Sequence, residues 1–224
     1  MNHMSLAFNS VRTSDKSVNI VLRNTYFLLS LCLMSCAAAT YASVVTQAMP
    51  GFLTMIIGTY GLLYLVHKNA DSGKGVLLSL AFSGFLGYTL GPIISHSLAL
   101  PSGTFILFTS ISTTGLVFLS LSAYVLQTRQ DFSFMGGMVF VGFMVVFAAM
   151  MLNILMGGIP AMYLIISAFI AMLASASILL HTSMIINGGE RNYILATVSL
   201  FVAIYNLFLS ILQILMFFSG SSRD

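Results

Sequence analysis

The stretch ILATVSLFVAIYNLFLSILQILMFF, residues 194–218, contains no Asp, Glu, Lys or Arg and is long enough to cross a lipid bilayer as one helix. A crossing needs about 20 consecutive apolar residues, and within the bilayer every backbone polar group must be paired inside the helix. Six comparable stretches precede it, so the sequence predicts an all-α membrane protein, a bundle of seven transmembrane helices. The predicted spans are residues 24–47, 50–66, 76–99, 104–126, 133–156, 160–186 and 194–218.

The composition agrees with this prediction. The chain of 224 residues is 58% hydrophobic and 6% charged, whereas soluble domains carry about 25% charged residues. We expect a flexible tail over residues 1–23 that becomes helical near Val18, a transmembrane domain over 24–218, and a short C-terminus over 219–224. The net charge of +3 comes without a basic cluster, so the sequence does not indicate nucleic-acid binding.

Positive charge is confined to alternate segments of the chain. The N-terminal tail and the second, fourth and sixth loops hold seven of the eight Lys and Arg residues, and only Arg223 lies at the far end. Because Lys and Arg concentrate in cytoplasmic loops, the N-terminus is predicted to be cytoplasmic and the C-terminus to lie outside. The seven residues are Arg12, Lys16 and Arg23 in the tail, then Lys68, Lys74, Arg129 and Arg191.

Ionisable side chains are almost absent from the predicted spans. None contains Asp or Glu, although proton relays and cation pathways usually rely on intramembrane carboxylates. His96 and His181 remain, and His181 is the candidate pH-sensing position because histidine titrates near physiological pH. The alternative is a neutral histidine bonded to a nearby hydroxyl or carbonyl group. No catalytic constellation, cofactor motif or zinc motif is present, so we do not expect an enzyme.

Small residues suggest how the third span packs. Gly84, Gly87 and Gly91 lie along one helix face and Pro92 follows, which favours close helix approach and a kink. A helix interrupted by glycine and proline can also line a binding cavity.

Other residues inside the spans have a packing interpretation as well. Asn153, Asn206 and Gln213 are predicted to bond between helices. Cys32 and Cys36 are four residues apart on one helix face, which favours packing, with a redox pair as the alternative.

Several long runs resemble the YccA branch of the Bax inhibitor superfamily, in order and from about residue 18 to the end. They are VLRNTYFLLSL (21–31), GFLGYTLGPI (84–93), SAYVLQTRQDFSFMGGM (122–138) and HTSMIINGGERNYILATVSLFVAIYNLF (181–208). This resemblance implies a last helix surrounded by the other six, and an inner-membrane location with a periplasmic C-terminus. It also implies a protein that binds and inhibits the membrane-bound AAA+ protease FtsH and is itself a substrate through its N-terminal tail.

The wider superfamily implies an alternative function, a pH-sensitive calcium leak gated by one acidic residue on the sixth helix and one on the seventh. Alignment on the last run places His181 and Ala203 at these positions, with Asn206 nearby. A histidine and an alanine cannot form a carboxylate pair, so calcium or another cation is expected only under this alternative. Protease regulation is therefore the preferred interpretation.

Overall fold

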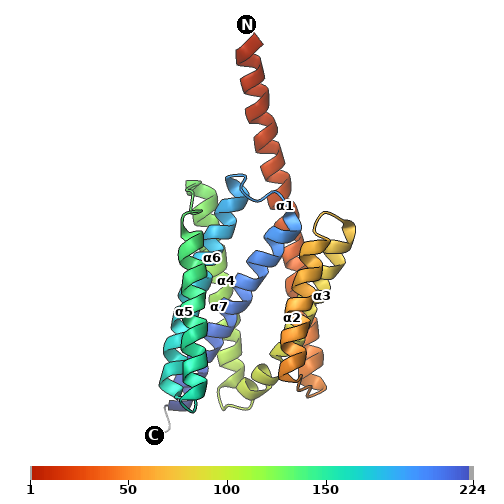
Figure 1. The fold of residues 1–224 in the computed structure, drawn as a ribbon. Helices are drawn as coiled ribbons and strands as arrows, with labels where there is room; N and C mark the ends of the chain where they lie inside the picture. Colours follow the sequence, from red (N-terminus) through yellow and green to blue (C-terminus); the bar gives the residue numbers. More distant parts are fainter. Residues whose placement is uncertain (1, 222–224) are drawn as a thin grey trace.

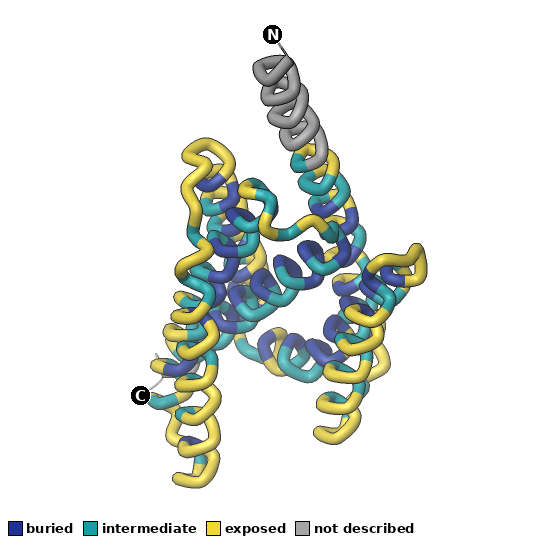
Figure 2. The backbone as a smooth tube through the Cα atoms, turned by 45° about the horizontal axis from the view of Figure 1, so that its top comes forward, coloured by how far each residue is buried: buried dark blue, intermediate teal, exposed yellow. Residues whose placement is uncertain are grey.

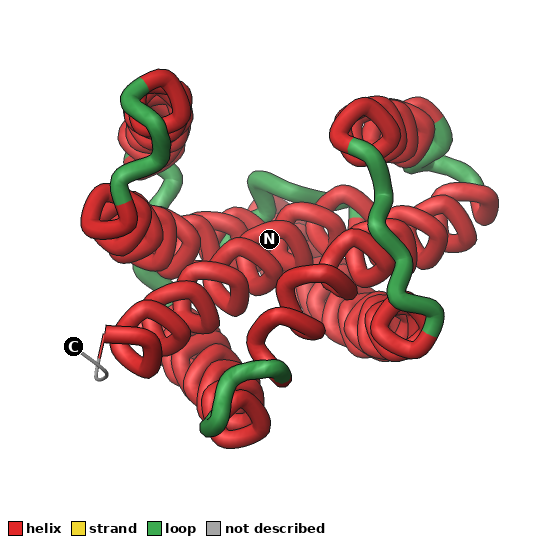
Figure 3. Tube along the Cα trace, turned by 90° about the horizontal axis from the view of Figure 1, so that it is seen from below, coloured by secondary structure: helices red, strands yellow, loops and turns green. Residues whose placement is uncertain are grey.

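The computed structural model describes the backbone of residues 2–221 and the side chains of residues 18–219, and this part of the chain is helical throughout, with short connections and no strand (Figures 1 and 3). The elements are α1 Asn2–Val45, α2 Phe52–Lys68, α3 Gly73–Leu98, α4 Gly103–Thr128, α5 Met135–Leu155, α6 Pro160–Ile186 and α7 Tyr193–Ser221.

The helix boundaries follow the breaks visible in the sequence. Apart from the start of α1, the largest differences from the predicted spans are three residues, at Gly73 against residue 76 and at Ser221 against residue 218. The backbone of α1 is helical from Asn2, earlier than the expected start near Val18. No Gly or Pro occurs before Pro50, so nothing in the sequence interrupts a helix that is already formed, and adding residues to it is easier than starting a new one. Residues 222–224, the end of the expected C-terminal segment, lie outside the described residues.

Among the described residues, six helices are long and apolar enough to cross a membrane: α3 to α7 and the part of α1 from Val18 to Val45. Helix α2 is apolar but has only 17 residues, at the lower limit for a crossing. The large side chains of α5 and α2 that face away from the bundle are exposed, as Figure 2 shows for their outer faces. In a bilayer such faces meet lipid rather than water.

Helix α7 holds much of the core. It packs against α1, α2, α3, α4 and α6, whereas α5 packs on α6. Leu200, Phe201, Leu207 and Leu212 on α7 are each no more than 2% exposed, and the Phe201 ring meets the Phe82 ring of α3 at 6.3 Å between centroids. Helix α7 therefore supplies several of the most deeply buried side chains of the core.

The seam between α1 and α3 is the closest helix contact described. A Cβ atom at Gly87 would overlap the backbone carbonyl of Cys36, and one at Gly91 would overlap the Ser43 side chain. Cys32 and Cys36 are free thiols buried in this seam, which agrees with the packing interpretation of the pair.

Hydroxyl groups of α1 follow the same seam and donate to backbone carbonyls of α3. Ser35 Oγ donates to Leu80 O at 3.0 Å, and Thr40 Oγ1 donates to Gly87 O at 2.8 Å. Ser43 Oγ donates to Tyr88 O at 2.7 Å. Tyr88 O is the carbonyl that would accept the amide of residue 92, and Pro92 has no N–H. Ser43 thus replaces the hydrogen bond that the proline removes, in a region where an unpaired carbonyl is costly.

Candidate functional site

Three loops and the part of α1 near Val18 lie at one end of the bundle. The α2–α3, α4–α5 and α6–α7 loops lie at this end, and the other three loops lie at the opposite end (Figure 1). Lys68, Lys74, Arg129 and Arg191 belong to the first set and are exposed. We call this the basic end. The charge pattern of the sequence and the fold therefore give the same division of the loops.

Asn192 joins two of these loops. Its side-chain nitrogen donates to Ala70 O at 3.0 Å and to the Asp71 carboxylate at 2.9 Å, which ties the α6–α7 loop to the α2–α3 loop. Its side-chain oxygen accepts from the amide of Ile194 at 2.9 Å, as the residue before a helix commonly does. One side chain thus caps α7 and fixes a loop some 120 residues away in sequence.

The α4–α5 loop is held by the end of α6. Ser183 Oγ accepts from the amide of Phe132 at 2.8 Å and donates to Gln130 O at 3.1 Å. Asn187 lies one turn further along α6, and its side-chain nitrogen donates to Ser183 Oγ at 3.1 Å. Ser183 is fully buried, so these bonds are shielded from competing water.

Two turns complete this end of the protein. Gly188 has φ +73°, and the amides of Gly188 and Gly189 donate to Ile185 O and Met184 O, which is a Schellman motif closing α6. In the α4–α5 loop the Asp131 carboxylate accepts from the amide of Ser133 at 2.9 Å, and the hydrogen bonds from Ser133 lower its pKa. These bonds hold the basic end in one conformation, which suits a surface for protein contact.

Asn192, Ser183 and Asn187 are absent from the sequence predictions. Asn192 could have been found, because an Asn directly before an apolar helical run is a capping signal. Ser183 and Asn187 carry no comparable signal, since their partners are loop residues more than 50 positions away.

The predicted gating residues lie on the two helices that the sequence assigned them. His181 is five residues from the end of α6, about 7 Å along the helix, and Ala203 is ten residues into α7, about 15 Å. Ala203 is 3% exposed within the core, and His181 is mostly buried and makes no hydrogen bond in the described part of the chain. A gating role for His181, Ala203 or Asn206 stays a prediction.

Of the three predicted interhelical amides, one forms the expected bond. Gln213 Oε1 accepts from Ser167 Oγ of α6 at 2.7 Å. The Asn153 side-chain oxygen instead accepts from the amide of Ile159 in the following loop at 2.9 Å, because that amide precedes α6 and has no partner within the helix. The Asn206 side chain makes no hydrogen bond among the described residues, because its face of α7 is only partly buried and meets no polar partner.

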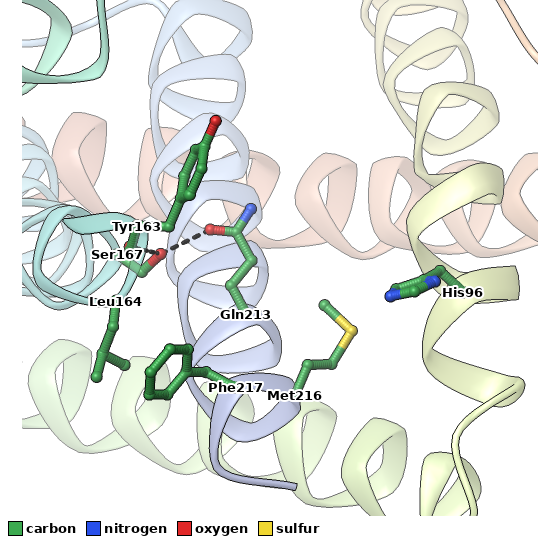
Figure 4. A pocket seen from close by; sticks show the side chains of 7 residues that line it. All are labelled: His96, Tyr163, Leu164, Ser167, Gln213, Met216 and Phe217. Carbon is green, nitrogen blue, oxygen red and sulfur yellow. Dashed lines mark hydrogen bonds between the residues drawn. The ribbon is translucent and has the colours of Figure 1, made fainter. Parts of the chain in front are cut away.

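A hollow of about 400 Å³ lies at the end of the bundle opposite the basic end, between α3, α6 and α7. Figure 4 shows His96 on one wall and the Ser167–Gln213 hydrogen bond on the other. The lining is amphipathic and carries no carboxylate, the group that would hold a calcium ion. Its residues are His96, Tyr163, Leu164, Ser167, Gln213, Met216 and Phe217.

Long apolar helices, with basic residues gathered on one set of loops, define a polytopic helical membrane protein. Residues 18–220 match the sequence profile of a family described as "Inhibitor of apoptosis-promoting Bax1". The chain belongs to the Bax inhibitor-1/YccA family.

Individual relatives are similar along nearly their whole length. The chain is 48% identical to the "Modulator of FtsH protease YccA" of Escherichia coli K12 over 214 residues, 95% of each chain. It is equally similar to a protein of another Escherichia coli strain named "Inner membrane protein YccA". An uncharacterized protein of Pseudomonas aeruginosa is 44% identical over 96% of each chain.

Proposed function

We propose that this protein is an inner-membrane modulator of an FtsH-type AAA+ protease, which it binds and inhibits while being a substrate itself. The observation that carries the proposal is the 48% identity, over 95% of both chains, to a protein named as a modulator of that protease. The basic end supports this proposal. Its three loops are held by hydrogen bonds and lie beside the part of α1 near Val18, so they offer a rigid surface for a protein partner.

The proposed topology follows from the charges. All seven helices, α2 included, cross the membrane around α7, with the N-terminus and the basic end in the cytoplasm and the C-terminus in the periplasm. This orientation places residues 1–23 on the side where a cytoplasmic ATPase works. A segment of this length reaches tens of ångströms when extended.

The mechanism is resistance to extraction. A protease that pulls on the N-terminal segment applies its force first to α1, and α1 is joined to α3 by close glycine contacts and by hydroxyl–carbonyl bonds. Each such bond contributes about 0.5–2 kcal/mol in a membrane protein. Slow extraction keeps the protease occupied and so spares other membrane substrates.

Deletion of residues 2–17 tests the substrate role. The purified protein and the protease are reconstituted together, and the degradation rates of the wild type and the deletion variant are compared. We expect the deletion to slow degradation at least fivefold without lowering the unfolding temperature of the bundle. Equal rates would refute the role of the tail, and failure to co-purify in either form would refute binding.

The alternative of a pH-sensitive cation leak is tested by ion flux in liposomes. We expect no calcium flux above that of empty liposomes at pH 6 or pH 7.5. A flux that rises with acidity and disappears in His181→Ala would reverse the ranking of the two functions.

A further inference from the structure

A second hollow, of about 170 Å³, lies at the basic end between α1, α4 and α6. It is large enough for a phosphate-sized group together with a few waters. Four of the six lining residues are apolar, but most of the surface that the lining leaves open to the hollow is polar. The polar side chains are an asparagine and an arginine. The lining residues are Val18, Asn19, Leu22, Leu126, Arg129 and Ile186.

Arg129 occupies an unusual backbone position beside this hollow. It is the residue that ends α4, with φ +51°, and glycine adopts this left-handed conformation at lower cost than any residue with a side chain. Its guanidinium forms no hydrogen bond or ion pair with the residues whose side chains are described. Arg129 is exposed and has no partner among the described side chains, so its donors are available to a ligand at the rim of the hollow.

Buried hydroxyl groups without partners lie one helical turn from three of the lining residues. Each is four residues from a lining residue, which places it one turn deeper on the same helix face. Tyr26 meets Phe118 at 6.0 Å between ring centroids, so α1 and α4 are in contact at this depth. The three are Tyr26 beside Leu22, Ser122 beside Leu126 and Thr182 beside Ile186, and no hydrogen bond to their hydroxyls is found in the described part of the chain.

We propose that this hollow binds the headgroup of an anionic phospholipid. The Arg129 guanidinium matches a phosphate in two parallel hydrogen bonds, and the hollow lies where apolar helices end, the depth at which lipid phosphates are found. The leucine, valine and isoleucine side chains suit the glycerol and upper acyl region, which a free phosphate lacks. This inference does not depend on the protease.

The test measures lipid binding to the purified full-length protein by native mass spectrometry and by the shift in unfolding temperature. The probes are phosphatidylglycerol, phosphatidylcholine with matched acyl chains, and inorganic phosphate. We expect phosphatidylglycerol to bind at least tenfold more tightly than phosphatidylcholine. Both lipids offer a phosphate to Arg129, but the choline cation of phosphatidylcholine is repelled by the guanidinium and cancels the charge of the headgroup.

Two variants remove the site in different ways. Arg129→Gly suits the left-handed backbone, so it should fold at least as well as the wild type while losing about tenfold in phosphatidylglycerol affinity. Leu22→Trp fills the hollow and keeps the charge, and it should lose affinity as well. Arg191→Gln removes an exposed charge from the same end outside the hollow and should leave binding unchanged within twofold.

Three results would overturn the proposal. The first is equal affinity of the wild type for the two lipids. The second is an Arg129→Gly variant that keeps the preference for phosphatidylglycerol. The third is protection by inorganic phosphate equal to that by the lipid, which would make the hollow a site for free anions.

Discussion

The hydrogen bond between Ser43 and the carbonyl of Tyr88 can be tested through its dependence on Pro92. Ser43 is 1% exposed, and its hydroxyl donates at 2.7 Å to the carbonyl that Pro92 leaves without an amide partner. Ser43→Ala leaves the Tyr88 carbonyl unpaired in a membrane-spanning helix, which costs about 1–2 kcal/mol of unfolding free energy. In a Pro92→Ala background residue 92 has an N–H that can pair with Tyr88 O, so the same serine change should cost about 0.5 kcal/mol or less.

The assay is a double-mutant cycle of unfolding free energies in detergent. The expected coupling between Ser43→Ala and Pro92→Ala is about 1 kcal/mol, above the additivity error of about 0.3–0.5 kcal/mol for independent sites. Ser30→Ala is the matched control, because Ser30 Oγ donates at 2.7 Å to Phe27 O within its own helix at an exposed position. If Ser43→Ala costs the same in both backgrounds, Ser43 does not replace the missing amide and the reasoning is refuted.

Three further changes probe the seam and the basic end. Gly87→Leu should lower the unfolding free energy by several kcal/mol, because the leucine side chain would meet the Cys36 backbone. Gly115→Leu is the control: the position faces open space, so the change should be less than about 0.5 kcal/mol. Thermal unfolding of both variants checks this. Asn192→Ala should cost about 1–2 kcal/mol and speed amide exchange in the α2–α3 loop, since cap and loop contacts are lost together; unchanged exchange would show that Asn192 does not hold that loop. Hydrogen bonds from Ser133 lower the folded-state pKa of Asp131, so this carboxylate stabilises the fold above the ordinary aspartate pKa and stops doing so as the pH falls through the lower folded value. Asp131→Asn should therefore reduce the dependence of the unfolding free energy on pH in that range. An identical pH profile for the variant and the wild type would contradict this.

Much of the candidate site could be read from the chain, but its contacts could not. The alternating charges predicted which loops share an end, since antiparallel helices with short connections place alternate loops together. The N-G-G run at 187–189 is a helix-ending signal, and Gly188 does take the left-handed conformation there. The ties made by Asn192 to Ala70 and by Ser183 to Gln130 join residues more than 50 positions apart, and no local pattern records such pairs.

The sequence by itself determined the helices, their boundaries apart from the start of α1, and the side on which positive charge gathers. These are local properties, because apolar run length sets a span and Gly, Pro and Asn interrupt it. Only the tertiary structure decided that the glycine face of α3 meets α1, that Ser43 serves the carbonyl freed by Pro92, and that Arg129 borders a hollow with unpartnered hydroxyls one helical turn from its lining. In a membrane nearly every helix face is apolar, so hydrophobicity cannot select a partner, and shape and hydrogen bonds between distant segments make that choice.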